Sequence, residues 1–124
     1  MTGDQTARLT SRCLSLPGAA EDYPFGDEVT VFKVVGKMFA LLLDAEPPRL
    51  TLKCDPNLAL ALRERYPAVV PGYHSNKRHW NTVDLDGSVP ERELFEMIEH
   101  SYELVVDGLT KAQRNQLRPE DDGT

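Results

Sequence analysis

The chain has 124 residues and a formal net charge of −6, with 40% hydrophobic and 27% charged side chains. This length suits one domain, and the composition is that of a globular protein rather than a disordered one. The two cysteines, Cys13 and Cys54, lie far apart and form no CxxC pair, which argues against a disulfide scaffold or a zinc knuckle. The first residues are polar, and the longest apolar run, 38–43, is too short to span a bilayer. We therefore expect a soluble cytoplasmic protein with reduced cysteines.

Charge is distributed unevenly along the chain. Residues 29–85 carry eight basic and five acidic side chains, whereas residues 86–124 carry four basic and ten acidic ones, and residues 1–28 are also acidic. Because the whole chain is acidic, any contact with a polyanion would have to use the middle segment.

The first predicted elements are a helix and a loop. Leu9, Cys13 and Leu16 recur at helical spacing, so residues 4–16 are expected to form a helix that ends at the following Pro-Gly pair. Residues 17–28 are rich in proline, glycine and acidic residues, which indicates a loop.

Three strands are predicted next. Residues 29–35 and 38–43 are β-branched, aromatic or apolar around a turn at Gly36-Lys37, which indicates a hairpin. Residues 49–54 alternate strictly between apolar and polar side chains. This alternation predicts that one face of the strand points toward the core and carries Leu50, Leu52 and Cys54. The opposite, open face carries Arg49, Thr51 and Lys53.

A second helix and two more strands follow. Asp55 is a good N-cap and Pro56 a good first helical residue, so a helix is expected to run to about residue 66. A short strand at 69–73 and a longer one at 77–85 come after it.

The last predicted element is a long amphipathic helix. Ser88-Val89-Pro90-Glu91 fits a capping box, and Gly108 marks the end of the helix. This helix must cover the sheet, so we expect one buried cluster of Leu50, Leu52, Leu94, Ile98 and Tyr102.

These elements predict an α+β fold in the order α-β-β-β-α-β-β-α, an antiparallel sheet flanked by helices. Residues 1–110 form the single expected domain, and residues 111–124 are polar enough to form a flexible tail.

The densest group of functional side chains lies at residues 73–82, but it carries no complete catalytic motif. His74 and His79 are five residues apart, which is not the spacing of HExxH, so we expect no metal site. There is no GxSxG elbow and no glycine-rich phosphate loop. A pair of Cys54 with either histidine remains open, although an inert buried thiol is favoured. We expect no cofactor, and a binding protein rather than an enzyme.

The predicted strand 77–85 suggests a binding surface. If Val83 and Leu85 face the core, Arg78 and Trp80 lie on the open face beside Arg49 and Lys53. Bases can stack on an exposed indole while cations contact the phosphates. The alternative is that Trp80 is structural and only covers the sheet.

Several segments of the chain resemble the MmcQ/YjbR family. They are Lys53-Cys54-Asp55-Pro56 before a helix, the run Val70-Pro71-Gly72-Tyr73-His74-Ser75-Asn76-Lys77-Arg78-His79-Trp80-Asn81-Thr82-Val83, and His100-Ser101-Tyr102-Glu103-Leu104-Val105. Leu16-Pro17-Gly18 and Pro24-Phe25-Gly26 also match, so the resemblance spans nearly the whole domain.

The resemblance implies a frataxin-like fold and DNA binding. By position it carries over Tyr73, His74, Lys77, His79 and Trp80 as site residues. Similarity to frataxins also raises iron binding, but the first predicted helix has no acidic ridge, which argues against it.

We therefore predict weak DNA binding of low specificity through a basic open face and the segment 73–80. The predicted binding residues are Arg49, Lys53, Tyr73, His74, Lys77, Arg78, His79 and Trp80. The alternative is a module that binds another protein or a small ligand, and an enzyme using His74 or His79 ranks third. We expect a monomer with no membrane partner.

Overall fold

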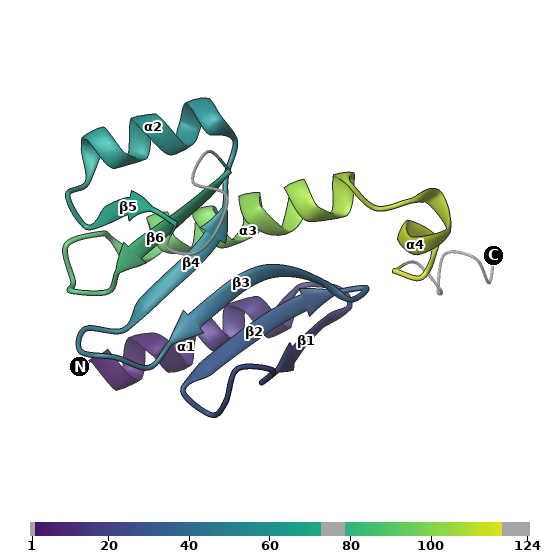
Figure 1. Ribbon diagram of the computed structural model, residues 1–124, viewed down its shortest axis with the longest axis horizontal. Coiled ribbons are helices and arrows are strands. Elements are labelled where there is room, and N and C mark those ends of the chain that lie inside the picture. The colour runs from purple at the N-terminus through teal and green to yellow at the C-terminus, as the bar shows by residue number, and fades with distance from the viewer. Residues whose placement is uncertain (1, 73–78, 118–124) are drawn as a thin grey trace.

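Six strands form one antiparallel sheet in the order β1-β2-β3-β4-β6-β5 (Figure 1). The computed structural model describes residues 2–72 and 79–117. In chain order the elements are α1 Thr2–Ser15, β1 Ala19–Asp22, β2 Val29–Val34, β3 Lys37–Leu43, β4 Arg49–Lys53, α2 Pro56–Arg65, β5 Val69–Pro71, β6 Trp80–Asp84, α3 Glu91–Asp107 and α4 Lys111–Asn115.

One face of this sheet carries the core. Alternate residues of the paired strands, among them Phe32, Leu42, Leu50 and Val83, are buried in one cluster with side chains of α1 and α3. The predicted burial of Leu50, Leu52, Leu94 and Ile98 is confirmed, while Tyr102 is partly buried against the cluster.

Helix α2 lies over the same face of the sheet as α1 and α3. Asn81 shares the core side of β6 with Val83 by alternation, and its amide bonds both the Arg63 guanidinium and the Ala59 carbonyl of α2. We call the opposite side of the sheet, away from α1, α2 and α3, the open face.

The expected element order needs two corrections. Residues 19–22, expected to be part of a loop, form the edge strand β1, which pairs with β2 from Ala19 opposite Val34 to Asp22 opposite Val31. Two alanines and two acids have little strand propensity, so the free edge of β2 decides their conformation. Within the stretch expected to be a tail, Lys111–Asn115 form helix α4, and Leu117 packs against the core.

The helix caps agree with the sequence in one case and differ in another. The carboxylate of Asp55 accepts hydrogen bonds from the backbone N–H groups of Asn57 and Leu58, as its N-cap role requires. The capping box predicted at Ser88 is wrong, because that hydroxyl bonds the Asp86 carboxylate and no side chain caps α3. Within the described residues, no helix is long and apolar enough to cross a membrane.

Candidate functional site

The centre of the open face is not basic. The strand register aligns Val70, Thr82, Thr51, Leu41 and Val31 in one row across five strands. The hydroxyl groups of Thr51 and Thr82 share a hydrogen bond of 2.9 Å, and both side chains are buried among their neighbours. A charged ligand would find few partners in this row.

The cations lie around that row, and two of them are paired with acids. The Arg49 guanidinium lies 3.1 Å from the Asp84 carboxylate, and the Lys33 ammonium lies 2.9 Å from that of Asp22. The hydrogen bond from Lys33 lowers the pKa of Asp22 below its ordinary value. Lys53 makes no ion pair within the described part of the chain.

Lys53 lies directly opposite Trp80 where β4 pairs with β6. With Arg49, these residues occupy the same side of the sheet, as the alternation of the sequence predicts. The backbone carbonyl of His79 accepts a hydrogen bond of 2.7 Å from the N–H of Cys54, so it belongs to the sheet backbone. The other predicted site residues, Tyr73, His74, Lys77 and Arg78, lie outside the described residues, and the binding role of the whole set stays a prediction.

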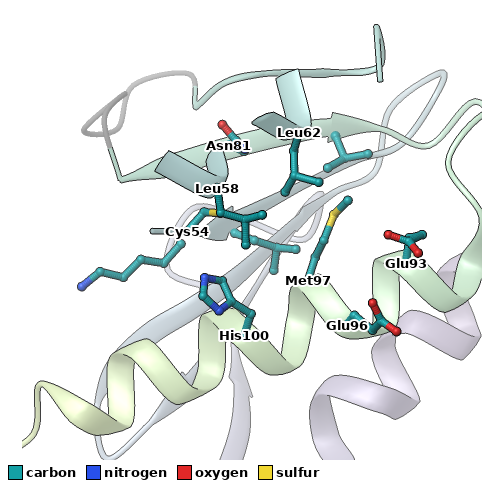
Figure 2. A pocket seen from close by; sticks show the side chains of 11 residues that line it. Cys54, Leu58, Leu62, Asn81, Glu93, Glu96, Met97 and His100 are labelled. Atoms are coloured by element: carbon teal, nitrogen blue, oxygen red, sulfur yellow. The ribbon is translucent and has the colours of Figure 1, made fainter. Parts of the chain in front are cut away.

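A pocket of about 270 Å³ lies on the core face between α2 and α3, a site that we did not predict from the sequence (Figure 2). Leu52 of β4, Val83 of β6 and Cys54, which follows β4, line one side, and α2 contributes Leu58 and Leu62. The side chains that line it from α3 are Glu93, Glu96, Met97 and His100.

The pocket exists because α2 packs against the sheet through a small residue. Ala59 is the one residue of α2 that is fully buried, while Leu58 remains 40% exposed above the pocket. Arg63 holds the helix to β6 by a hydrogen bond of 2.7 Å from its Nε to the Oδ1 of Asn81. Two apolar side chains of α2, Leu58 and Leu62, therefore line the pocket, and Leu62 also packs against the edge of the core.

His100 is fixed at the wall of this pocket. Its Nε2 accepts a hydrogen bond of 3.3 Å from the backbone N–H of Asp55, so in the neutral ring the proton sits on Nδ1. His100, Glu93 and Glu96 could have been noticed in the sequence, because they recur on one face of the predicted last helix.

Both cysteine thiols are held in the protonated form. Burial raises the pKa of Cys13 to about 12 and that of Cys54 to about 11. A thiolate is therefore scarce at neutral pH, which disfavours a nucleophilic Cys54. Within the described ranges, no group of three or more His, Cys, Asp or Glu side chains could hold a metal ion.

We expect iodoacetamide to alkylate the native protein much more slowly than the urea-unfolded protein at pH 7.5, with Cys54 reacting before Cys13. The pKa values of both thiols in the folded protein lie above the pKa of an exposed thiol, about 9. The protonated thiols therefore contribute to stability in full below about pH 9. This contribution is lost as the pH rises from 9 toward 11 and 12. Mass spectrometry of timed samples measures the rates, and equal rates in native and unfolded protein would contradict the assignment.

Comparison with known proteins identifies the family. A family model described as YjbR matches residues 14–104. The Escherichia coli O157:H7 protein YbdF is 41% identical over 86% of this chain and 88% of its own length. The protein YjbR of Escherichia coli strain K12 is 35% identical over 90% of this chain and 95% of its own length. The names of these relatives state no activity or ligand.

Solved structures agree with this assignment. A Deinococcus radiodurans protein whose crystal structure is described as a DUF419 domain is 45% identical, with a TM-score of 0.84 over 90% of this chain and 86% of that one. A Pseudomonas syringae protein of known crystal structure is 29% identical, with a TM-score of 0.68 over 84% of this chain and 98% of that protein's chain. Since the family model covers most of the chain and the relatives match it along nearly their whole length, this chain belongs to the YjbR family.

Proposed function

We propose that the chain binds single-stranded nucleic acid, weakly and with low specificity, at the end of the open face where Lys53 lies opposite Trp80. The cross-strand pairing of these two residues is the observation that carries the proposal. A base can stack on an indole while the neighbouring ammonium contacts a phosphate, and this combination tolerates any sequence.

The electrostatics support a small footprint. Arg49 and Lys33 are each held by an acid, and the chain as a whole carries a net charge of −6. The sequence places two further basic residues, Lys77 and Arg78, just before β6, and we count them with Lys53 as the cations of the site. With about three phosphates neutralised, the slope of log affinity against log salt is about −2.1 for a single strand and −2.7 for a duplex. The dissociation constant at physiological salt should fall in the non-specific range of about 10⁻⁴ to 10⁻⁶ M.

Two substitutions separate the stacking contribution from the ionic one. Trp80→Ala should weaken binding of an oligothymidine strand by about 1–3 kcal/mol. Lys53→Gln should instead flatten the salt slope by about 0.7, because one phosphate contact is lost. Fluorescence anisotropy at several salt concentrations measures both effects.

Lys111→Gln is the matched control, because it makes the same charge change on the exposed surface of α4. If the wild-type protein is folded and binds no strand even in low-salt buffer, the nucleic-acid proposal is wrong. If Trp80→Ala only lowers the melting temperature, the indole is structural. The alternative, a module for a protein or small-ligand partner, would then be favoured.

We also propose that the fold is frataxin-like, as the family resemblance implies. An antiparallel sheet with α1 and α3 packed on one face supports this proposal. Superposition on a frataxin structure, with the strand order compared, is the test.

A further inference from the structure

We propose that the pocket between α2 and α3 binds a small, largely apolar organic cation of the primary-amine class. This site is on the core side of the sheet, whereas the surface that we propose for nucleic acid is on the open face, and Lys53 contributes to both. Its volume of about 270 Å³ is just below the usual range for small-molecule sites, about 300–1,000 Å³, and therefore suits only a small ligand.

The lining suits an apolar body. Leu52 and Val83 form a buried apolar floor, and Met97 faces them from α3. The thioether of Met97 is flexible and makes favourable contacts with aromatic rings. Leu58 is 40% exposed above the floor, so a ligand that covers it removes apolar surface from water.

The charge of the pocket comes from two acids of α3 without ion-pair partners. On the side of α3 that faces α1, Glu91 lies 2.9 Å from Arg8 and Glu99 lies 3.4 Å from Arg12. The half-buried Glu93 and the exposed Glu96 line the pocket instead, and no ion pair joins either of them to another residue of the described chain. Figure 2 shows both carboxylates on the same helix beside Met97. An ammonium group in the pocket would form a partly exposed ion pair with them.

Two cations lie near the pocket, and among the described residues no ion pair joins either of them to Glu93 or Glu96. The register of β4 places the Lys53 side chain on the open face, opposite Trp80, although the residue contributes to the pocket rim. The Arg63 guanidinium is engaged by neutral oxygens, since it is hydrogen-bonded to the pocket residue Asn81 and to the Trp80 carbonyl. The pocket therefore favours a cationic ligand over an anionic one.

Three probes of similar shape test the charge preference on the full chain: 2-phenylethylamine, 2-phenylethanol and 3-phenylpropanoate. Titrations followed by NMR should give saturable shifts of the Met97 methyl and His100 ring signals. We expect the amine to bind about two- to fivefold more tightly than the alcohol, as for a partly exposed ion pair, and the carboxylate to bind most weakly.

Glu96→Gln should reduce the preference for the amine over the alcohol, and the double variant Glu93→Gln/Glu96→Gln should bring the two affinities close together. Glu99→Gln is the matched control, because it removes the same charge from the α1 side of the same helix and should leave the preference unchanged. An excess of oligothymidine should not displace the amine, which separates this site from the proposed nucleic-acid surface.

Three results would overturn the proposal. Equal affinities for amine and alcohol in the wild-type protein would show that the acids do not select the ligand, and tighter binding of the carboxylate would reverse the assigned charge. Absence of saturable shifts with all three probes would show that the pocket is not a binding site. None of these results depends on whether the protein binds nucleic acid.

Discussion

Replacing Leu50 with alanine should lower the free energy of unfolding by about 2–5 kcal/mol. Leu50 is completely buried on β4, and its cross-strand neighbours on the core face are Leu42 and Val83. Packed strands on both sides leave little room for the structure to collapse around the lost methyl groups, so a cavity remains. This loss is a large share of the 5–15 kcal/mol that usually stabilises a domain.

Leu60→Ala is the matched control for Leu50→Ala. Leu60 is 59% exposed on α2, so the same chemical change should alter stability by no more than about 0.5 kcal/mol. Urea unfolding followed by circular dichroism measures both variants. Similar losses in the two would mean that β4 does not lie at the centre of the core.

Replacing Ser101 with alanine should cost about 1–3 kcal/mol of unfolding free energy. The completely buried hydroxyl of this α3 residue donates a hydrogen bond to the Phe39 carbonyl and accepts one of 2.9 Å from the N–H of Lys53. It thus joins β3 and β4 just beyond their last registered pair, Ala40 with Leu52. Alanine would leave the buried Phe39 carbonyl and the partly buried Lys53 N–H without this partner.

Hydrogen exchange makes the Ser101 prediction specific. The amide of Lys53 should exchange faster in Ser101→Ala than in the wild-type protein, while amides at the centre of β4 should change only with global stability. Ser15→Ala, which removes an exposed hydroxyl bonded to the Arg12 carbonyl, is the control and should have little effect. Unchanged exchange at Lys53 would show that this hydrogen bond does not matter.

The sequence was most informative where a local pattern directly reflects burial. The strict alternation of residues 49–54 predicted which side chains of β4 face the core, and the pairing of β4 with β6 confirms it. Asp55 before Pro56 predicted the start of α2, because an N-cap bonds backbone groups only two and three residues away. Such signals need no knowledge of distant segments.

Local patterns failed where a distant partner decides the outcome. The edge strand β1 has the composition of a loop and is a strand only because β2 offers it a free edge. Ser88 fits a capping box by spacing, but its hydroxyl bonds the nearer Asp86 carboxylate. In both cases a competing partner outweighed the local preference.

The sequence by itself determined the α+β class, the family resemblance and the shared face of Arg49, Lys53 and Trp80, since a period of two is a local property of any strand. Only the tertiary structure decided that Asp84 neutralises Arg49, because cross-strand register joins residues far apart in the chain. The pocket likewise required the placement of α2 against α3, which depends on the small contact at Ala59 and the hydrogen bond from Arg63 to Asn81. Packing between distant elements, rather than local periodicity, therefore created this pocket.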